Sequence, residues 1–210
     1  FVKGQSRASA ILVCNKEALA NIPVGWSHKD YLFPVNGVTS RDLALTIGTR
    51  ERRGDFRVLS AGTMLRVKGF GLAIRAFEEF ATKHPGVTFS IFGSGPERPR
   101  LQAMLGESKV ASQVRLLEAV PRDELLSQMA ESDVFLFPSL RDGGGAVVVE
   151  AMAAGKPVVC LDCGGPGMHV TPECGVKITP STPTATVHEL ADALERLYLD
   201  EGLRARLGET

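Results

Sequence analysis

Residues 139–146 combine an acidic side chain, Asp142, with three consecutive glycines, directly after an apolar run that ends at Pro138. Glycines lack a Cβ atom and therefore let the backbone approach a ligand closely. The helix expected to begin at Ala146 would add unpaired backbone N–H groups and the positive end of its dipole. This pattern predicts a cradle for an anionic group, although a flexible turn capped locally by Asp142 would explain the glycines equally well.

A second carboxylate, Glu150, follows Asp142 by eight positions and would lie in the helix expected to begin at Ala146. Its neighbours Ala146, Val147, Val148, Val149 and Ala151 are all apolar. A charge in such surroundings is rarely buried without a partner. Sugar hydroxyl groups would be suitable hydrogen-bond donors to it, and a structural arginine or a capped helix would satisfy it as well, so both interpretations stay open.

A further cluster of candidate anion ligands lies in residues 62–69, which contain Arg66 and Lys68. Both side chains are suited to phosphate oxygens. The segment is not a P-loop, because Lys68 follows a single glycine by six positions and no Ser or Thr comes after it. A third loop, residues 93–96, carries a lone Gly-x-Gly that Pro96 at a helix start explains structurally.

These loops separate short β-rich runs from longer helical patterns. The predicted strands are residues 56–61, 87–92, 113–117, 134–138, 157–161 and 175–178. The predicted helices are residues 70–83, 97–105, 122–131, 146–154 and 187–199. Strands that alternate with helices form a parallel sheet covered on both faces, which predicts a doubly wound, Rossmann-like α/β domain. Such sheets bind ligands at the carboxyl ends of their strands, where the loops 62–69, 93–96, 118–121, 139–145 and 162–167 would lie.

The first 48 residues show a different organisation. Residues 8–15 are predicted to form a strand that enters a short helix, residues 31–35 form another strand, and Asn36-Gly37 is a turn. We expect residues 1–48 to be a remnant of a preceding domain with a hinge, and residues 49–210 to be the ligand-binding domain. The first residue, Phe1, is not Met, so we expect the chain to start inside a longer protein.

The amino-acid composition limits the classes of molecule that this protein is expected to bind. The 210 residues include 24 Lys and Arg and 24 Asp and Glu, so no basic field is available to attract nucleic acid, and any anion site must be local. Apolar runs fall far short of the roughly 20 residues that span a bilayer.

Four cysteines are few for this length, which favours reduced thiols in a cytoplasmic protein. Zinc is a spacing-based alternative for Cys160, Cys163, His169 and Cys174, but Cys160 falls in a predicted strand, which favours buried thiols.

The most specific sequence motif runs from the glycine-rich loop into the segment that follows it. Its residues are Pro138, Ser139, Asp142, Gly143, Gly145 and the run Glu150-Ala-Met-Ala-Ala-Gly-Lys-Pro-Val-Val159. This combination resembles the group 1 family of retaining, nucleotide-sugar-dependent glycosyltransferases with the GT-B fold. Similar stretches are residues 35–37, 68–69, 93–96, 132–138 and 162–165, so that the resemblance covers about 170 residues.

The resemblance implies the C-terminal, donor-binding half of a two-domain enzyme that transfers a sugar with retention. The donor would be a UDP or GDP sugar, used in polysaccharide or glycolipid synthesis, and no cofactor or metal ion is expected. The acceptor would be held by the missing N-terminal domain, so the isolated chain is expected to be inactive. The resemblance also allows peripheral membrane association of the full-length protein.

The resemblance also implies roles for individual residues. The catalytic residues would be Asp142, Glu150 and Lys68. The donor phosphates would be bound by Thr63, Arg66, Lys68, Gly144 and Gly145. The ribose and the transferred sugar would be bound by Asp142, Gly143, Ala146, Val147 and Glu150. The base would lie against Gly93, Ser94, Leu117, Glu118 and Val120.

Four positions depart from the family pattern. Thr63 stands where an arginine is usual, Asp142 replaces a glutamate, Glu118 replaces a glycine and Met168 replaces a glutamate. These departures leave the donor specificity open. Two alternatives of other classes also remain, a nucleotide-sugar epimerase and a non-catalytic sugar-nucleotide-binding module.

Overall fold

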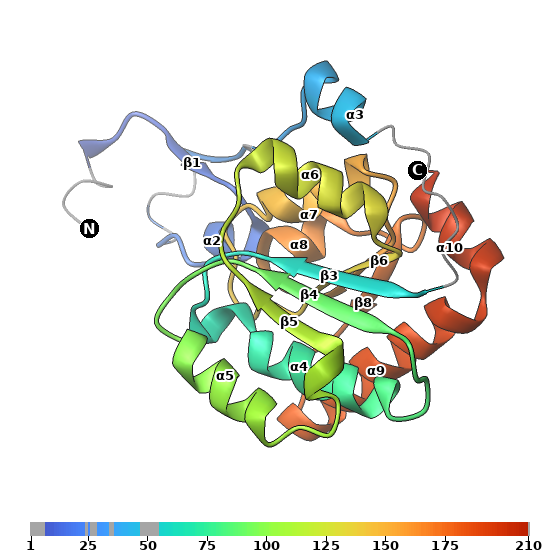
Figure 1. Ribbon diagram of the computed structural model, residues 1–210. Helices are drawn as coiled ribbons and strands as arrows, with labels where there is room; N and C mark the ends of the chain where they lie inside the picture. The colour runs from blue at the N-terminus through green and yellow to red at the C-terminus, as the bar shows by residue number, and fades with distance from the viewer. Residues whose placement is uncertain (1–6, 24, 26–28, 34–35, 47–54, 210) are drawn as a thin grey trace.

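The computed structural model describes residues 7–23, 25, 29–33, 36–46 and 55–209. Its central feature is a parallel sheet of six strands in the order β5-β4-β3-β6-β7-β8 (Figure 1). The strands are β3 (Arg57–Ala61), β4 (Thr88–Phe92), β5 (Val114–Leu117), β6 (Val134–Phe137), β7 (Val158–Leu161) and β8 (Gly175–Ile178). The strand order reverses between β3 and β6, which is the topological switch point where such sheets bind ligands. The predicted doubly wound parallel sheet is confirmed.

Helices cover both faces of this sheet (Figure 1). One face carries α4 (Phe70–Ala81), α5 (Arg98–Gly106) and α9 (Pro183–Leu199), and the other carries α6 (Arg122–Glu131), α7 (Ala146–Ala153) and α8 (Gly164–His169). The final helix, α10 (Glu201–Gly208), follows α9. Each face has its own apolar core, because the strands alternate buried side chains between the two layers.

Helix α4 shows how the pattern of apolar residues produces this packing. Its residues Phe70, Ile74, Phe77 and Phe80 recur at helical spacing and are all buried. The Phe77 ring centroid lies 5.2 Å from that of Phe89 on β4 and 6.1 Å from that of Phe80. These aromatic contacts fix α4 on the sheet, and with it the loop that precedes the helix.

The N-terminal segment forms a separate two-stranded parallel sheet of β1 (Ile11–Val13) and β2 (Asp30–Leu32), with α2 (Lys16–Ala20) between them. The predicted strand 31–35 was therefore placed too late, and its residues 34–35 lie outside the described residues. A helix, α3 (Ser40–Thr46), occupies part of the segment expected to be a hinge. Thr39 and Asp42 form its N-terminal cap: Asp42 Oδ2 accepts from Thr39 N at 2.7 Å, and Thr39 Oγ1 accepts from Asp42 N at 3.2 Å.

Further elements differ from the sequence-based expectation, and α9 begins at Pro183 rather than at the predicted residue 187. Residues 162–167 were expected to form a loop, but α8 begins at Gly164. Glycine and proline are poor helix formers, so packing rather than local preference holds this helix. A short 3₁₀ helix, η2 (Arg66–Lys68), lies in the loop after β3, and α10 had not been anticipated. Residues 47–54, where the predicted domain boundary falls, lie outside the described residues.

Within the described ranges, every helix is too short or too polar to cross a lipid bilayer. This agrees with the apolar runs of the sequence, and it concerns only these residues.

Replacement of Phe77 by Ala should lower the free energy of unfolding by about 3–5 kcal/mol, because it removes a fully buried ring from the core between α4 and β4. The matched control is Phe33→Ala, since the Phe33 side chain is 54% exposed and its loss should change the stability by less than about 0.5 kcal/mol. Urea denaturation of the two variants and the parent chain measures both values. Equal effects of the two substitutions would contradict this description of the core.

Candidate functional site

The glycine-rich loop leaves β6 and enters α7 at the carboxyl edge of the sheet. Gly145 is the N-cap of α7 and has φ 70°, a left-handed conformation that favours glycine. A Cβ atom at Gly145 would also lie 3.0 Å from Pro166 N. Asp142 Oδ1 accepts a hydrogen bond from Gly145 N at 2.7 Å. The local cap that the sequence left open as an alternative is therefore present.

The second oxygen of Asp142 contacts Lys68. Lys68 Nζ and Asp142 Oδ2 form an ion pair, and the two side chains are only 18% and 15% exposed. Lys68 Nζ also lies 5.8 Å from the centre of the Phe137 ring. Two of the three predicted catalytic residues thus lie in direct contact, and each neutralises the charge of the other.

Backbone contacts place Lys68 beside the glycine-rich loop. Leu140 N donates to Val67 O at 2.8 Å, which joins η2 to the loop after β6. Gly69 follows with φ 71°, and a Cβ atom there would overlap the Pro138 carbonyl group. The Lys68-Gly69 pair noted in the sequence therefore has a steric reason: only glycine allows the two loops to approach this closely.

The third predicted catalytic residue, Glu150, has a partner within the chain. Arg122 Nε donates to Glu150 Oε1 at 2.6 Å, and Arg122 also pairs with Asp42 of α3. The pKa of Arg122 is raised, mainly by its hydrogen bond to Asp42 and next by its hydrogen bond to Glu150. The pKa of Asp42 is lowered from 3.8 to about 2. The largest cause is a hydrogen bond from the Thr39 backbone, and the second is the hydrogen bond from the Arg122 side chain. The structural arginine considered from the sequence is thus present beside Glu150.

A cavity of about 190 Å³ lies beyond the ends of β3 and β4. Three of the residues predicted to contact the base line it, namely Gly93, Ser94 and Val120, and Thr63 lines it as well. The loops meet closely here, because a Cβ atom at Gly93 would lie only 3.0 Å from the carbonyl carbon of Gly62. Thr63 therefore lies in the cavity expected to hold the base, rather than with Lys68.

Leu117 and Glu118, also predicted to contact the base, are not among the residues that line this cavity. Arg98 holds both: its Nη1 atom donates to Leu117 O at 3.1 Å, and its Nη2 atom pairs with Glu118 Oε1 at 3.0 Å. Arg98 thus fastens the loop after β5.

Three other predicted ligands have different surroundings. Arg66 lines a separate cavity, and in the described part of the chain it makes no hydrogen bond or ion pair with Lys68 or Asp142. Ala146 is exposed beside the loop, whereas Val147 packs against the core under α7. The contribution of these three residues to donor binding stays a prediction.

The sequence pattern of the family described as "Glycosyl transferases group 1" matches residues 48–210. The chain belongs to this family. The match covers the whole six-stranded domain and leaves out the N-terminal β1–β2 unit.

Curated relatives of this group 1 domain are glycosyltransferases. It is 34% identical over 160 residues to D-inositol 3-phosphate glycosyltransferase of Acidothermus cellulolyticus, covering 71% of this chain and 35% of that protein. It is 33% identical over 141 residues to 2-deoxystreptamine glucosyltransferase of Streptomyces kanamyceticus, covering 66% and 35%. The chain therefore matches about a third of the length of these relatives.

Solved structures show the same fold. The pneumococcal O-GlcNAc transferase in complex with UDP and GlcNAc has a TM-score of 0.80 at 20% identity, over 98% of this chain and 42% of that one. The C-terminal domain of a group 1 glycosyl transferase from Francisella tularensis has a TM-score of 0.67 at 21% identity, over 82% and 93%. The group 1 domain thus has the architecture of a GT-B C-terminal domain.

Sequence reasoning missed the part that the N-terminal segment has in this site. Asn15 caps α2 through Oδ1, which accepts from Ala18 N, and its Nδ2 atom donates to Gly143 O at 2.8 Å. Glu17 Oε1 accepts from Gly164 N at 2.7 Å. The Asn15 cap could be inferred from local sequence, but its contact with a loop 128 positions away could not.

Two further side chains contact the glycine-rich loop. His169 Nε2 lies 2.8 Å from Gly144 O. The amide of Asn36 faces Gly144, where a Cβ atom would lie 2.5 Å from Asn36 Nδ2. This Nδ2 atom is buried and has no hydrogen-bond partner among the described residues. An unpaired buried donor is uncommon, so Asn36 is a candidate donor to a ligand at the loop.

The thiols of Cys160 and Cys163 favour the protonated form, which is the less reactive one. Burial raises the pKa of Cys160 to about 12, and burial likewise raises the pKa of Cys163. Across the residues that the structure describes, no group of three or more His, Cys, Asp or Glu side chains is arranged to bind a metal ion. The spacing-based zinc alternative therefore has no cluster to support it there.

Substitution of Gly165 by Ala should displace α8 from the glycine-rich loop, because the added Cβ would lie 2.5 Å from Gly144 O. We expect a loss of about 1–3 kcal/mol in unfolding free energy and altered amide NMR signals at residues 143–145. In Gly106→Ala, the control at the end of α5, the new Cβ meets nothing within 4 Å, so stability should be unchanged or slightly higher. Unchanged loop signals in Gly165→Ala would contradict the tight contact.

The Asp42–Arg122 pair should make stability depend on acid. Since the pKa of Asp42 is lower in the folded chain, its stabilising effect is complete above pH 3.8 and is lost as the pH falls towards 2. Asp42→Asn should remove this part of the acid dependence in urea denaturation. The control Asp123→Asn removes a carboxylate that pairs with Arg41 and leaves the Asp42–Arg122–Glu150 contacts in place. An Asp42→Asn variant with the parental acid profile would rule out the pair as its source.

Proposed function

We propose that this domain binds a nucleotide diphosphate sugar and, with an N-terminal acceptor domain, transfers the sugar with retention of anomeric configuration. The observation that carries the proposal is the juxtaposition of Lys68 and Asp142 at the glycine-rich loop. The cavity lined by Gly93 and Ser94 opens at the same carboxyl edge of the sheet. The family match and the glycosyltransferase relatives support it, and they do not favour an epimerase.

When the donor binds, Lys68 and the Gly145 N–H group would exchange their contacts with Asp142 for contacts with the donor. Asp142 holds both Lys68 Nζ and Gly145 N. A diphosphate would offer both donors new oxygens, because charge-assisted hydrogen bonds to phosphate are strong. Asp142 would then be free to accept hydrogen bonds from hydroxyl groups of the transferred sugar. Glu150, oriented by Arg122, would accept from the ribose hydroxyls.

The chemistry follows from where charge develops. Breaking the anomeric C–O bond leaves positive charge on the sugar and negative charge on the nucleotide diphosphate. Lys68 and the N–H groups of Gly144 and Gly145 would stabilise that leaving group, because fixed donors lower the barrier where charge appears. Asp142 would face the positive sugar. The acceptor would come from the N-terminal domain, and a membrane contact of the full-length protein would belong there too.

Calorimetric titration with UDP, GDP and ADP tests the donor-binding step on this chain. We expect one of the three nucleotides to bind, and we expect Lys68→Ala and Glu150→Gln each to weaken it by about tenfold or more. Lys109→Ala and Glu107→Gln are matched controls, because both positions are exposed and lie at the end of α5, outside the site. Circular dichroism shows whether the variants stay folded.

Absence of binding to all three nucleotides, with the chain folded, would overturn the proposal. Unfolding of Lys68→Ala or Glu150→Gln would instead indicate that these ion pairs serve mainly to hold the loops together. A full-length protein that binds nucleotide but transfers no labelled sugar would favour the non-catalytic binding module.

A further inference from the structure

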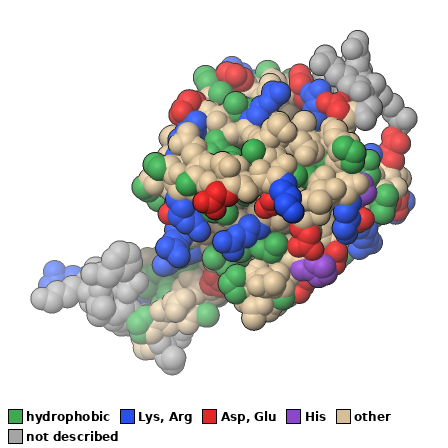
Figure 2. Space-filling view, turned by 60° about the horizontal axis from the view of Figure 1, so that its bottom comes forward, with side chains coloured by type: hydrophobic (Ala, Val, Ile, Leu, Met, Phe, Trp, Pro, Cys, Tyr) green, Lys and Arg blue, Asp and Glu red, His purple; other side chains and the backbone are tan. Residues whose placement is uncertain are grey.

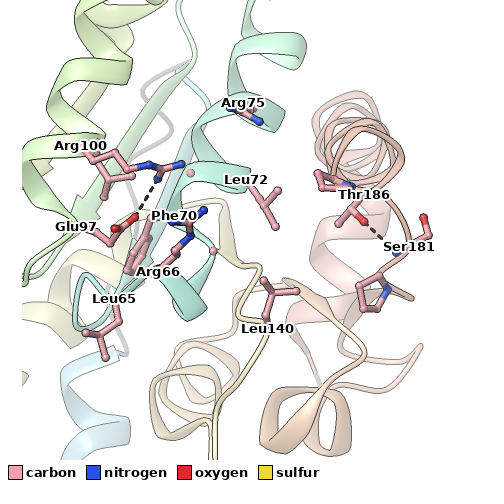
Figure 3. Close-up of a pocket in the computed structure, with 15 residues that line it drawn as sticks. Leu65, Arg66, Phe70, Leu72, Arg75, Glu97, Arg100, Leu140, Ser181 and Thr186 are labelled. Carbon is pink, nitrogen blue, oxygen red and sulfur yellow. Dashed lines mark hydrogen bonds and ion pairs between the residues drawn. The ribbon is translucent and has the colours of Figure 1, made fainter.

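A second cavity, of about 280 Å³, opens on the α4, α5 and α9 face of the sheet (Figure 3). It lies where these three helices begin and where the loop after β6 passes. Phe70 and Leu101 form a buried apolar floor, and Leu65, Leu72 and Leu140 extend this apolar lining to the surface. The volume approaches the lower end of the range of small-molecule sites, about 300 Å³.

Three arginines from different elements surround this floor (Figure 3). Arg66 comes from η2, Arg75 from α4 and Arg100 from α5. Arg100 pairs with Glu97 at 3.0 Å, whereas the side chains of Arg66 and Arg75 make no hydrogen bond or ion pair within the described residues. Three guanidinium groups thus face one carboxylate in a chain whose net charge is zero. Figure 2 shows a group of Lys and Arg side chains on this side of the molecule.

The backbone leaves room for one of these groups. A Cβ atom at Gly71 would lie 3.3 Å from Arg100 Nη1, so the absence of a side chain there lets the guanidinium lie against α4. The opposite wall is polar but uncharged: Thr186 Oγ1 accepts from Ser181 N at 3.2 Å (Figure 3). The cavity is therefore positive on one wall, hydroxylated on the other and apolar at its floor.

This cavity is distinct from the proposed donor site. It shares no lining residue with the cavity of Gly93 and Ser94, and neither Lys68 nor Asp142 lines it. Arg66 and Lys68 belong to the same 3₁₀ turn, yet Lys68 pairs with Asp142 while Arg66 lines this second cavity. Ligand binding in this cavity is therefore separate from nucleotide binding at Lys68.

We propose that this cavity binds a phosphate monoester. Such a group carries nearly two negative charges at neutral pH, which matches the excess of two guanidinium groups over carboxylates. Arginine forks bind phosphate oxygens in a bidentate manner, and the apolar floor would take the organic part of the ligand. The phosphate could come from a small soluble metabolite or from the headgroup of a lipid, and the chemistry recognised is the same.

Phenyl phosphate is a suitable probe, with phenol as its uncharged counterpart. Calorimetry should show binding of phenyl phosphate and none of phenol. Arg66→Ala and Arg75→Ala should each weaken binding by about tenfold or more, because each removes a charge-assisted contact. Arg115→Ala is the matched control, since it removes an exposed arginine from β5, away from both cavities. Lys68→Ala should leave this binding unchanged.

The opposite pattern would overturn the proposal. Loss of phenyl phosphate binding in Lys68→Ala, but not in Arg75→Ala, would assign the phosphate to the donor site. Equal binding of phenol and phenyl phosphate would reduce the cavity to an apolar site. Arg75→Lys keeps the charge without the fork, so a folded Arg75→Lys variant that binds phenyl phosphate more weakly than the parent supports bidentate contact even if Arg75→Ala is unstable.

The two sources of the phosphate are separated by sedimentation with vesicles. Capture on phosphatidic acid vesicles but not on phosphatidylcholine vesicles, lost in Arg75→Ala and kept in Arg115→Ala, supports a lipid headgroup. Binding of phenyl phosphate without capture on either vesicle supports a soluble ligand. Failure of both probes would overturn the proposal, and it would leave the result of the nucleotide titrations unaffected.

Discussion

The backbone contact between the glycine-rich loop and α8 is the constraint on which the site depends. Gly165 N donates to Asp142 O at 3.0 Å, and Cβ atoms at Gly164 or Gly165 would overlap the backbone of the opposing loop. Helix α8 has little intrinsic stability, so this packing must hold it. The contact fixes the loop, the loop fixes Asp142, and Asp142 fixes Lys68. Asn15 and Glu17 strengthen the same contact from the N-terminal segment.

Charge in the site is balanced internally. Asp142 pairs with Lys68, and Arg122 joins Glu150 to Asp42. These partners keep largely buried carboxylates from standing alone, which would be costly in apolar surroundings. They also mean that a charged ligand must compete with protein groups for each contact. The zero net charge of the chain thus conceals pairs whose members lie far apart in sequence, together with the unbalanced arginines around the second cavity.

Much of the fold was predictable, because apolar periodicity directly reflects burial. All six predicted strands agree with β3 to β8 to within one residue at each end. Helix α8 was missed because its glycine-rich sequence indicates a loop, and only the facing loop makes it helical. In the candidate site, Lys68, Asp142 and Glu150 are predictions from residue type, spacing and family resemblance, and the contacts that each of them makes differ in how far the sequence could predict them. The cap on Gly145 is local and was considered, whereas the Arg122–Glu150 pair joins α6 to α7.

The sequence alone determined the order of elements, the loops that hold the candidate site and the residue types available in them. These features depend on local periodicity and on the positions of glycines. Only the tertiary structure decided that Thr63 lines the cavity of Gly93, that Arg66 lines a different cavity from Lys68, and that Asn15 reaches Gly143. The physical reason is that direction and contact depend on how separate loops pack. A 3₁₀ turn of three residues can present neighbouring cations to two sites, and no spacing rule assigns them.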